Sequence, residues 1–346
     1  MKLGEPLPIG DDTIVVSGQE MRLETAQPDV ANAIVHRAGR TLVIVDTGAT
    51  AAFRRPLLDA SRQLAPWSSV LLLTTHGHLD HVGNNDLLDD IAADAGIRDA
   101  RHFVPAHDVR QLTDPGSYWK ANLGRLAGVL PGFDDTDSIV AMVLGMFAPQ
   151  RPASAATRTF EELPLEHLRI GPAHVTGWTF CDGAVHVART QGHCAGQVVV
   201  HLVGPGLLHL SDEPNGPCAA MHDADQVKML GAVGWALTAV QSGAVALVTE
   251  GHQFQLYDSD AATARLTGLL DDAARLDAAL QPAASPSCTP AEFLPAFRKA
   301  SAELSPTTAN PSEIFSALAA LSKLRDLGMT ASGTGACQRW TRPWPH

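Results

Sequence analysis

The sequence predicts an α/β (α+β) fold that carries a mainly helical insertion and a C-terminal helical extension. Short runs of β-type residues alternate with amphipathic helical patterns over the first 280 residues. One apolar run, 70–73, passes directly through a polar loop to a helix start at 84–88. Hydrophobic residues make up 45% of the 346 residues, which suffices for a substantial core.

The N-terminal segments predict an antiparallel meander. Residues 13–16, 33–36 and 41–45 are short β-type runs parted by short polar links. The third run ends in Asp46-Thr47-Gly48, and a helical pattern then covers residues 51–64. These segments therefore open a domain that we expect to span residues 1–280.

Three histidines and an aspartate fall within six positions after the strand at 70–73. His76 and His78 are two apart in extended chain, so their side chains point the same way and can chelate one ion. Asp80 and His81 lie where the chain turns toward helix, so they can serve a second ion. Imidazole and carboxylate donors suit zinc, and iron and manganese accept the same donors. An ordinary polar loop gives no reason for four such groups to share six positions.

The H-x-H-x-D-H order resembles the signature of the metallo-β-lactamase-fold metallohydrolase superfamily, which includes lactonases, glyoxalase II-like thioesterases and phosphotriesterases. Thr190–Gln197 resembles a second family element, T-x-G-H-x-x-G, with Gln191 where a proline is common. The resemblance implies an αββα sandwich with a two-metal site at one edge. Carried over residue by residue, the implied metal ligands are His76, His78, Asp80, His81, His193, Asp212 and His252.

The resemblance also implies a role for each ligand beyond the first motif. His193 completes the triad of the first metal. Asp212 follows a predicted hairpin over 198–210 and is the carboxylate that bridges both ions. His252 follows a predicted buried strand at 245–248 and joins the second metal.

Other polar residues near these motifs receive weaker expectations. In the family an aspartate placed like Asp46 supports the metal loop through hydrogen bonds, and a simple turn aspartate is the alternative. Glu213 is a neighbour of the site that could also face solvent. We assign no role to Cys194, and we expect His209 and His222 to be ordinary strand and loop histidines.

Residues 106–183 form the expected insertion. Its segment 139–147 is apolar on all sides, which predicts a buried helix that thickens the core or makes a dimer contact. The alternative is a lid whose Met and Phe side chains wall an apolar substrate pocket.

The C-terminal part predicts helices and an irregular tail. A helical stripe runs through Val227, Leu230, Val233, Leu237 and Val240, and another covers 266–280. Cap-box patterns with proline at the first helical position begin two further helices, at Thr289–Glu292 and Asn310–Glu313. This extension, 281–346, resembles the helical appendages that shape the substrate site of glyoxalase II-type thioesterases. The alternatives are a dimer contact or simple coverage of the fold. The tail after Gly328 is expected to be irregular.

Composition excludes several classes of partner. The formal charge of −12 argues against nucleic acid, because phosphate binding requires a basic face. Five scattered cysteines without a C-x-x-C pair predict reduced thiols in a cytoplasmic protein. The N-terminus has no apolar core of signal-peptide length, and no run approaches a membrane span, so we expect no membrane partner.

The resemblance thus implies a metal-dependent hydrolase with two divalent metal ions, for which zinc is expected and iron or manganese would fit. A metal-bridging hydroxide would attack the carbonyl of a small, partly apolar ester, lactone or thioester, with Asp80 and Asp212 as the catalytic carboxylates. A phosphotriesterase or a halide-releasing hydrolase would use the same site. A di-iron oxidoreductase of the same fold is a further alternative.

Overall fold

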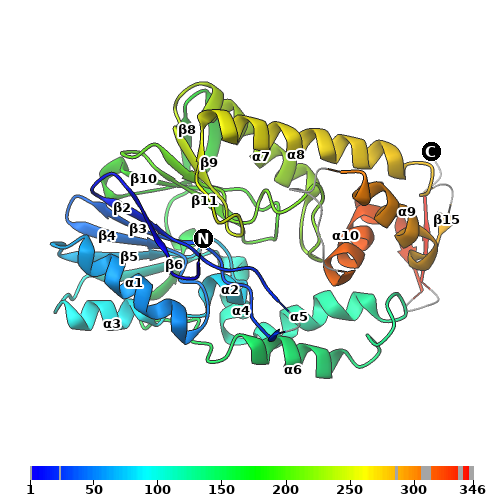
Figure 1. Ribbon diagram of the computed structural model, residues 1–346, viewed down its shortest axis with the longest axis horizontal. Helices are drawn as coiled ribbons and strands as arrows, with labels where there is room; N and C mark the ends of the chain where they lie inside the picture. The colour runs from blue at the N-terminus through cyan, green and yellow to red at the C-terminus, as the bar shows by residue number, and fades with distance from the viewer. Residues whose placement is uncertain (1, 23–24, 285–286, 305–312, 334–337, 343–346) are drawn as a thin grey trace.

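The protein is described here by a computed structural model that covers residues 2–22, 25–284, 287–304, 313–333 and 338–342. Two seven-stranded sheets lie face to face, and helices cover the outer face of each (Figure 1). The architecture is the metallo-β-lactamase αββα sandwich, as predicted.

The first sheet follows the chain order from its first strand to its seventh. Its strands are β1 (Pro6–Ile9), β2 (Thr13–Val16), β3 (Ala33–Ala38), β4 (Thr41–Val45), β5 (Ser69–Leu73), β6 (Ala100–Val104) and β7 (Thr157–Thr159). Strands β1 to β4 pair antiparallel, which confirms the predicted meander. From β4 to β7 the pairing is parallel.

The second sheet has the order β14-β13-β12-β11-β10-β9-β8. Its strands are β8 (Glu166–Ile170), β9 (Ala173–Phe180), β10 (Val185–Arg189), β11 (Val198–Leu202), β12 (Leu207–His209), β13 (Leu247–Thr249) and β14 (Tyr257–Asp258). Strands β11 and β12 pair antiparallel, as the predicted hairpin requires. Between β12 and β13 the pairing is parallel.

Alternation along each strand explains why both sheet faces are apolar. Val43 and Val45 of β4 point between the sheets, where they pack with Trp178 and Val200 of the second sheet. Their neighbours on β4 point outward against the covering helices. Strands buried on both faces read as continuous apolar runs, which is why these segments were visible in the sequence.

The covering helices come from both halves of the chain. Helices α1 (Ala51–Gln63) and α3 (Leu87–Asp94) cover the first sheet, and α7 (Gln226–Gln241) and α8 (Ser259–Leu280) cover the second (Figure 1). The buried face of α7 differs from the predicted stripe. Val233 and Val240 of the stripe are buried, but Val227 is 81% exposed, and Met229 and Ala236 are buried in addition. Small residues such as alanine form much of the contact between α7 and the second sheet. A prediction made only from the spacing of large apolar residues therefore misplaces the buried face.

The predicted insertion, 106–183, contains two different parts. Its first part is helical and comprises η2 (Ala106–Asp108), α4 (Val109–Thr113), α5 (Pro115–Leu123), η3 (Gly124–Leu126) and α6 (Thr136–Met146). Its second part supplies β7, η4 (Phe160–Glu162), β8, β9 and η5 (Cys181–Gly183), so three of its strands belong to the two sheets. The apolar segment 139–147 is not buried all round, because Met142 is 57% exposed while Val140 and Phe147 are buried.

The C-terminal extension packs beside the helical part of the insertion (Figure 1). It contains α9 (Pro290–Ala302) and α10 (Glu313–Asp326), and Thr289 and Glu292 form the predicted capping box. The second predicted cap box, from Asn310, lies mostly outside the described residues. The tail is not wholly irregular: β16 (Thr330–Ser332) and β17 (Arg339–Thr341) join β15 (Ser287–Cys288) in a small sheet.

The described residues bear on the expectations about membrane spans and cysteine pairing. None of the helices there is both long and apolar enough to cross a membrane. The cysteines at 181, 194, 218 and 288 form no disulfide with one another.

Candidate metal centre

The seven predicted ligands meet at one edge of the sandwich. The loop after β5 and the short helix α2 (Leu79–Val82) carry four of them, and the loops after β10, β12 and β13 carry one each. They form two groups that share Asp212. The first cluster is His76, His78, His193 and Asp212, and the second cluster is Asp80, His81, Asp212 and His252.

The first cluster places three imidazole nitrogens around one carboxylate oxygen. Nδ1 of His78 lies 2.9 Å from Nε2 of His76 and 3.3 Å from Nε2 of His193. Oδ2 of Asp212 lies 3.9 Å from Nε2 of His76 and 3.5 Å from Nε2 of His193. Ligands about 2.0–2.1 Å from a tetrahedral zinc ion are roughly 3.3 Å from one another, so this spacing fits such an ion.

The second cluster is built from two carboxylates and two imidazoles. Nε2 of His252 lies 3.0 Å from Oδ2 of Asp80 and 3.3 Å from Oδ2 of Asp212. Nε2 of His81 lies 3.2 Å from Oδ1 of Asp212 and 3.5 Å from Oδ2 of Asp80. Asp212 therefore presents one oxygen to His81 and the other to the remaining ligands. A single carboxylate in this position can contact two cations.

The electrostatics of the clusters favour a cation in each. Burial, together with the neighbouring His193, lowers the pKa of His78 to about 3, so its lone pair is free at neutral pH. Burial alone would raise the pKa of Asp80, but His81 and His252 hold it at about 2. Burial likewise opposes the charged form of His81, and Asp212, Asp80 and Asp46 outweigh it and raise its pKa to about 10. Burial also opposes the charged form of Asp212, but His252 and His81 hold the pKa of Asp212 well below its usual range. The two buried carboxylates thus keep their negative charge and attract positive charge to this site.

Hydrogen bonds from surrounding residues orient the ligands. Oδ2 of Asp46 lies 2.8 Å from Nδ1 of His81 and accepts the Thr75 hydroxyl at 2.7 Å, while its Oδ1 accepts the Thr75 N–H at 2.8 Å. This geometry gives Asp46 the supporting contacts that the family resemblance implies. Asp29, which the sequence did not single out, lies 3.2 Å from Nδ1 of His252.

Glu213 does not face solvent but is buried beneath the first cluster. Its carboxylate accepts the backbone N–H groups of Gly192 and His193 at 2.9 and 3.1 Å. Burial raises its pKa to about 7. The same turn explains Gln191, whose φ of +59° lies far from the value near −65° that proline requires. The departure from the family pattern is therefore a different turn, and not only a loss of rigidity.

The helical part of the insertion reaches the metal loop. The hydroxyl of Tyr118 lies 2.9 Å from Nε2 of His78, and the ring of Trp119 lies 5.8 Å from the same imidazole. Asp108 accepts the backbone N–H of Gly77 at 2.9 Å. A Cβ on Gly196 would come within 2.1 Å of Asp108, so only glycine allows this approach. No motif marks these residues in the sequence.

Three residues set aside in the sequence stay outside both clusters. His209 is buried on β12, and burial lowers its pKa to about 4. His222 lies in a loop with its ring 5.2 Å from that of Tyr118. Cys194 is fully buried beside His193 and belongs to neither ligand group.

Comparisons with known proteins agree with this geometry. Residues 26–145 match the family model described as the metallo-beta-lactamase superfamily. No curated protein matches the chain.

Solved structures extend the similarity over nearly the whole chain. A beta-lactamase domain protein from Burkholderia ambifaria is 16% identical with a TM-score of 0.59, over 99% of this chain and 96% of its own. A metallo-beta-lactamase family protein from Thermus thermophilus is 17% identical with a TM-score of 0.56, over 96% and 99%. The sec-alkylsulfatase Pisa1 from Pseudomonas sp. is 19% identical with a TM-score of 0.53, over 93% of this chain and 49% of its own. At these identities the likeness shows a shared fold.

Proposed function

We propose that this metallo-β-lactamase superfamily chain is a hydrolase that uses two divalent cations, with zinc as the expected metal. The proposed substrate is a small, partly apolar ester, lactone or thioester. The observation that carries the proposal is the sharing of Asp212 between two ligand groups of four residues each. Two bound cations supply Lewis acidity and lower the pKa of a water molecule toward neutrality.

The residues of the clusters suggest how the reaction is arranged. The side chains of His252 and Asp80 are 15% and 11% exposed, whereas those of His76 and His81 are fully buried. A substrate therefore approaches from the side of Asp80. The carboxylate of Asp80 stays ionised because of its low pKa, so it can accept a hydrogen bond from a water molecule and orient it.

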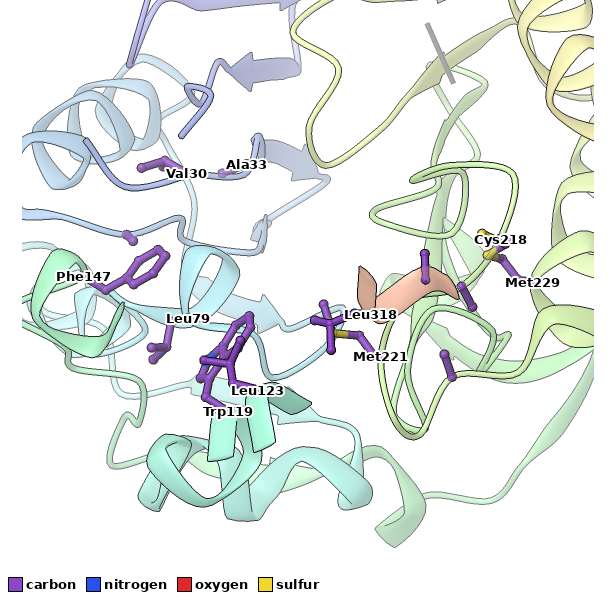
Figure 2. Close-up of a cluster of buried hydrophobic side chains, with 14 of the residues drawn as sticks. Val30, Ala33, Leu79, Trp119, Leu123, Phe147, Cys218, Met221, Met229 and Leu318 are labelled. Carbon is purple, nitrogen blue, oxygen red and sulfur yellow. The ribbon is translucent and has the colours of Figure 1, made fainter. Parts of the chain in front are cut away.

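A buried hydrophobic cluster next to a proposed metal ligand favours a partly apolar substrate. Figure 2 shows one buried hydrophobic cluster, which includes Leu79 of α2, Trp119 and Leu123 of α5, Leu318 of α10, and Met221 from the loop before α7. Trp119 joins this cluster to the ring of His78. Phe147, from the segment 139–147 for which a lid was the alternative expectation, belongs to the same cluster.

The proposal is tested by His78→Ala, with His167→Ala, an exposed histidine of strand β8, as the matched control. We expect His78→Ala to lose the ion of the first cluster and the hydrolysis of every substrate in an ester, lactone, thioester and phosphotriester panel. The control should keep both. Metal content is measured by elemental analysis beside the rate. An active His78→Ala variant that resists chelators would contradict the proposal.

A further inference from the structure

The hydroxyl of Tyr118 lies between a proposed metal ligand and a carboxylate. It is 2.9 Å from Nε2 of His78, and it donates to Oδ1 of Asp223 at 3.0 Å. Tyr118 belongs to α5 of the insertion, and Asp223 belongs to the loop before α7. Three segments that are distant in the sequence thus meet through one hydroxyl group.

The protons available to the hydrogen-bonded groups of Asp223, Tyr118 and His78 determine the tautomer of the His78 imidazole. A phenol has one proton, and an ionised carboxylate can only accept. Because Tyr118 gives its proton to Asp223, its oxygen must accept from Nε2–H of His78. Nδ1 of His78 then carries the free lone pair. That nitrogen is the one 2.9 Å from His76 and 3.3 Å from His193, at the centre of the first cluster.

Asp223 is itself held in place from several sides. Its Oδ2 accepts the backbone N–H of Ala195 at 3.1 Å, in the loop that carries a ligand of the first cluster. The backbone N–H of His222 donates to Asn122 of α5 at 2.8 Å, and its carbonyl accepts from Arg325 of α10 at 2.9 Å. The insertion and the C-terminal extension therefore position this carboxylate together.

We infer that Tyr118 is a positioning residue for the first cluster, which orients His78 and fixes its tautomer through the chain Asp223–Tyr118–His78. The inference rests on the proposed function, because it assumes that the first cluster holds a metal ion. It gives the insertion a second task besides covering the site.

The test compares Tyr118→Phe with Tyr257→Phe, since these are the chain's two tyrosines and Tyr257 bonds only to Gln255 through its hydroxyl in the described structure. Zinc affinity is measured by competition with a chromophoric chelator. Loss of a group that orients a ligand weakens metal binding by about 10–100-fold. We expect this change for one of two zinc ions in Tyr118→Phe and for neither in Tyr257→Phe.

Two backgrounds show which ion is affected. In His81→Ala, which retains the first cluster, Tyr118→Phe should weaken zinc binding by the full factor. In His78→Ala, which retains the second cluster, it should have no further effect. Asp223→Asn keeps the size of the side chain and should weaken the first ion by a smaller factor.

The outcomes separate this inference from the proposed function. If the wild-type protein binds no zinc, the proposed function and the inference both fail. If the wild type binds two zinc ions and Tyr118→Phe binds both with unchanged affinity, only the inference fails. An equal loss of zinc affinity in the His81→Ala and His78→Ala backgrounds would also overturn the inference. Such a loss would indicate general destabilisation and not an effect on the first cluster.

Discussion

At the scale of single residues, Asp46 shows how one buried carboxylate can organise a metal loop. Its two oxygens hold the backbone and hydroxyl of Thr75 and Nδ1 of His81. The side chain is completely buried and its φ is +56°, so the turn after β4 places it there. Nε2 of His81 is thereby directed toward the second cluster.

We expect Asp46→Ala to weaken zinc binding at the second cluster by about 10–100-fold, because His81 loses the partner that orients its ring. Competition with a chelator measures the change. Asp12→Ala, which removes the partner of Arg37 in a surface ion pair, is the control and should bind zinc like the wild type. Wild-type affinity in Asp46→Ala would show that the ring is held by other contacts.

Residue identity could be predicted where a motif crowds several donors together, or where the family resemblance carries a ligand over, as for His193, Asp212 and His252. The spacing of the first motif identifies His76, His78, Asp80 and His81. Asp46 is identified by its place after a strand. Tyr118, Asp29 and Asp223 carry no such signal, because a lone tyrosine or aspartate in a polar segment is common. Folding alone brings them to the site.

At the scale of secondary-structure elements, His102 joins three parallel strands. Its Nε2 lies 2.9 Å from the hydroxyl of Thr74 after β5, and its Nδ1 lies 2.9 Å from the hydroxyl of Thr157 in β7. Burial lowers the pKa of His102 to about 3. The folded protein therefore binds fewer protons here than the unfolded chain between about pH 6.5 and 3.

The sign of this difference gives a pH dependence. Stability from His102 is complete above pH 6.5 and is lost as the pH falls toward 3, at up to about 1.4 kcal/mol per pH unit. His102→Gln should therefore show a shallower decline of the free energy of unfolding than the wild type between pH 7 and 4.5. Urea unfolding of metal-free protein measures it, with the exposed His167→Gln as control. Parallel declines in wild type and His102→Gln would refute the assignment.

Strands that are buried on both faces could be predicted from the sequence. Half-exposed strands could be predicted less well. β4, β5 and β11 are continuous apolar runs, whereas β7 is Thr157-Arg158-Thr159 at a sheet edge. Edge strands need few apolar residues, so β7 and β8, at the edges of the two sheets, gave no clear pattern. β16 and β17 were missed for the same reason, since most of their residues are exposed.

At the scale of the whole molecule, the C-terminal extension is anchored to the sandwich by a buried charge. Lys323 of α10 is 1% exposed in its side chain and pairs with Asp277 of α8. The extension also contacts the loop beside the metal centre, where the Ser322 hydroxyl donates to the carbonyl of Ala220 at 3.0 Å. The sequence predicted the extension but not this anchor, because the pair joins segments that are distant along the chain.

Substitution of Asp277 and substitution of Lys323 should have unequal effects on the free energy of unfolding. Asp277→Ala leaves a buried ammonium group without its partner and should lower the free energy of unfolding by about 3 kcal/mol. Lys323→Met removes the charge and keeps most of the volume, so it should change stability little or increase it. Urea unfolding compares the two variants. A larger loss in Lys323→Met than in Asp277→Ala would contradict the role of the buried charge.

The most direct measurement is anomalous diffraction at the zinc edge from crystals of the intact chain grown with zinc. Two peaks should appear, one among His76, His78 and His193 and one among Asp80, His81 and His252, with Asp212 between them. A single peak, or peaks away from these residues, would contradict a two-metal centre.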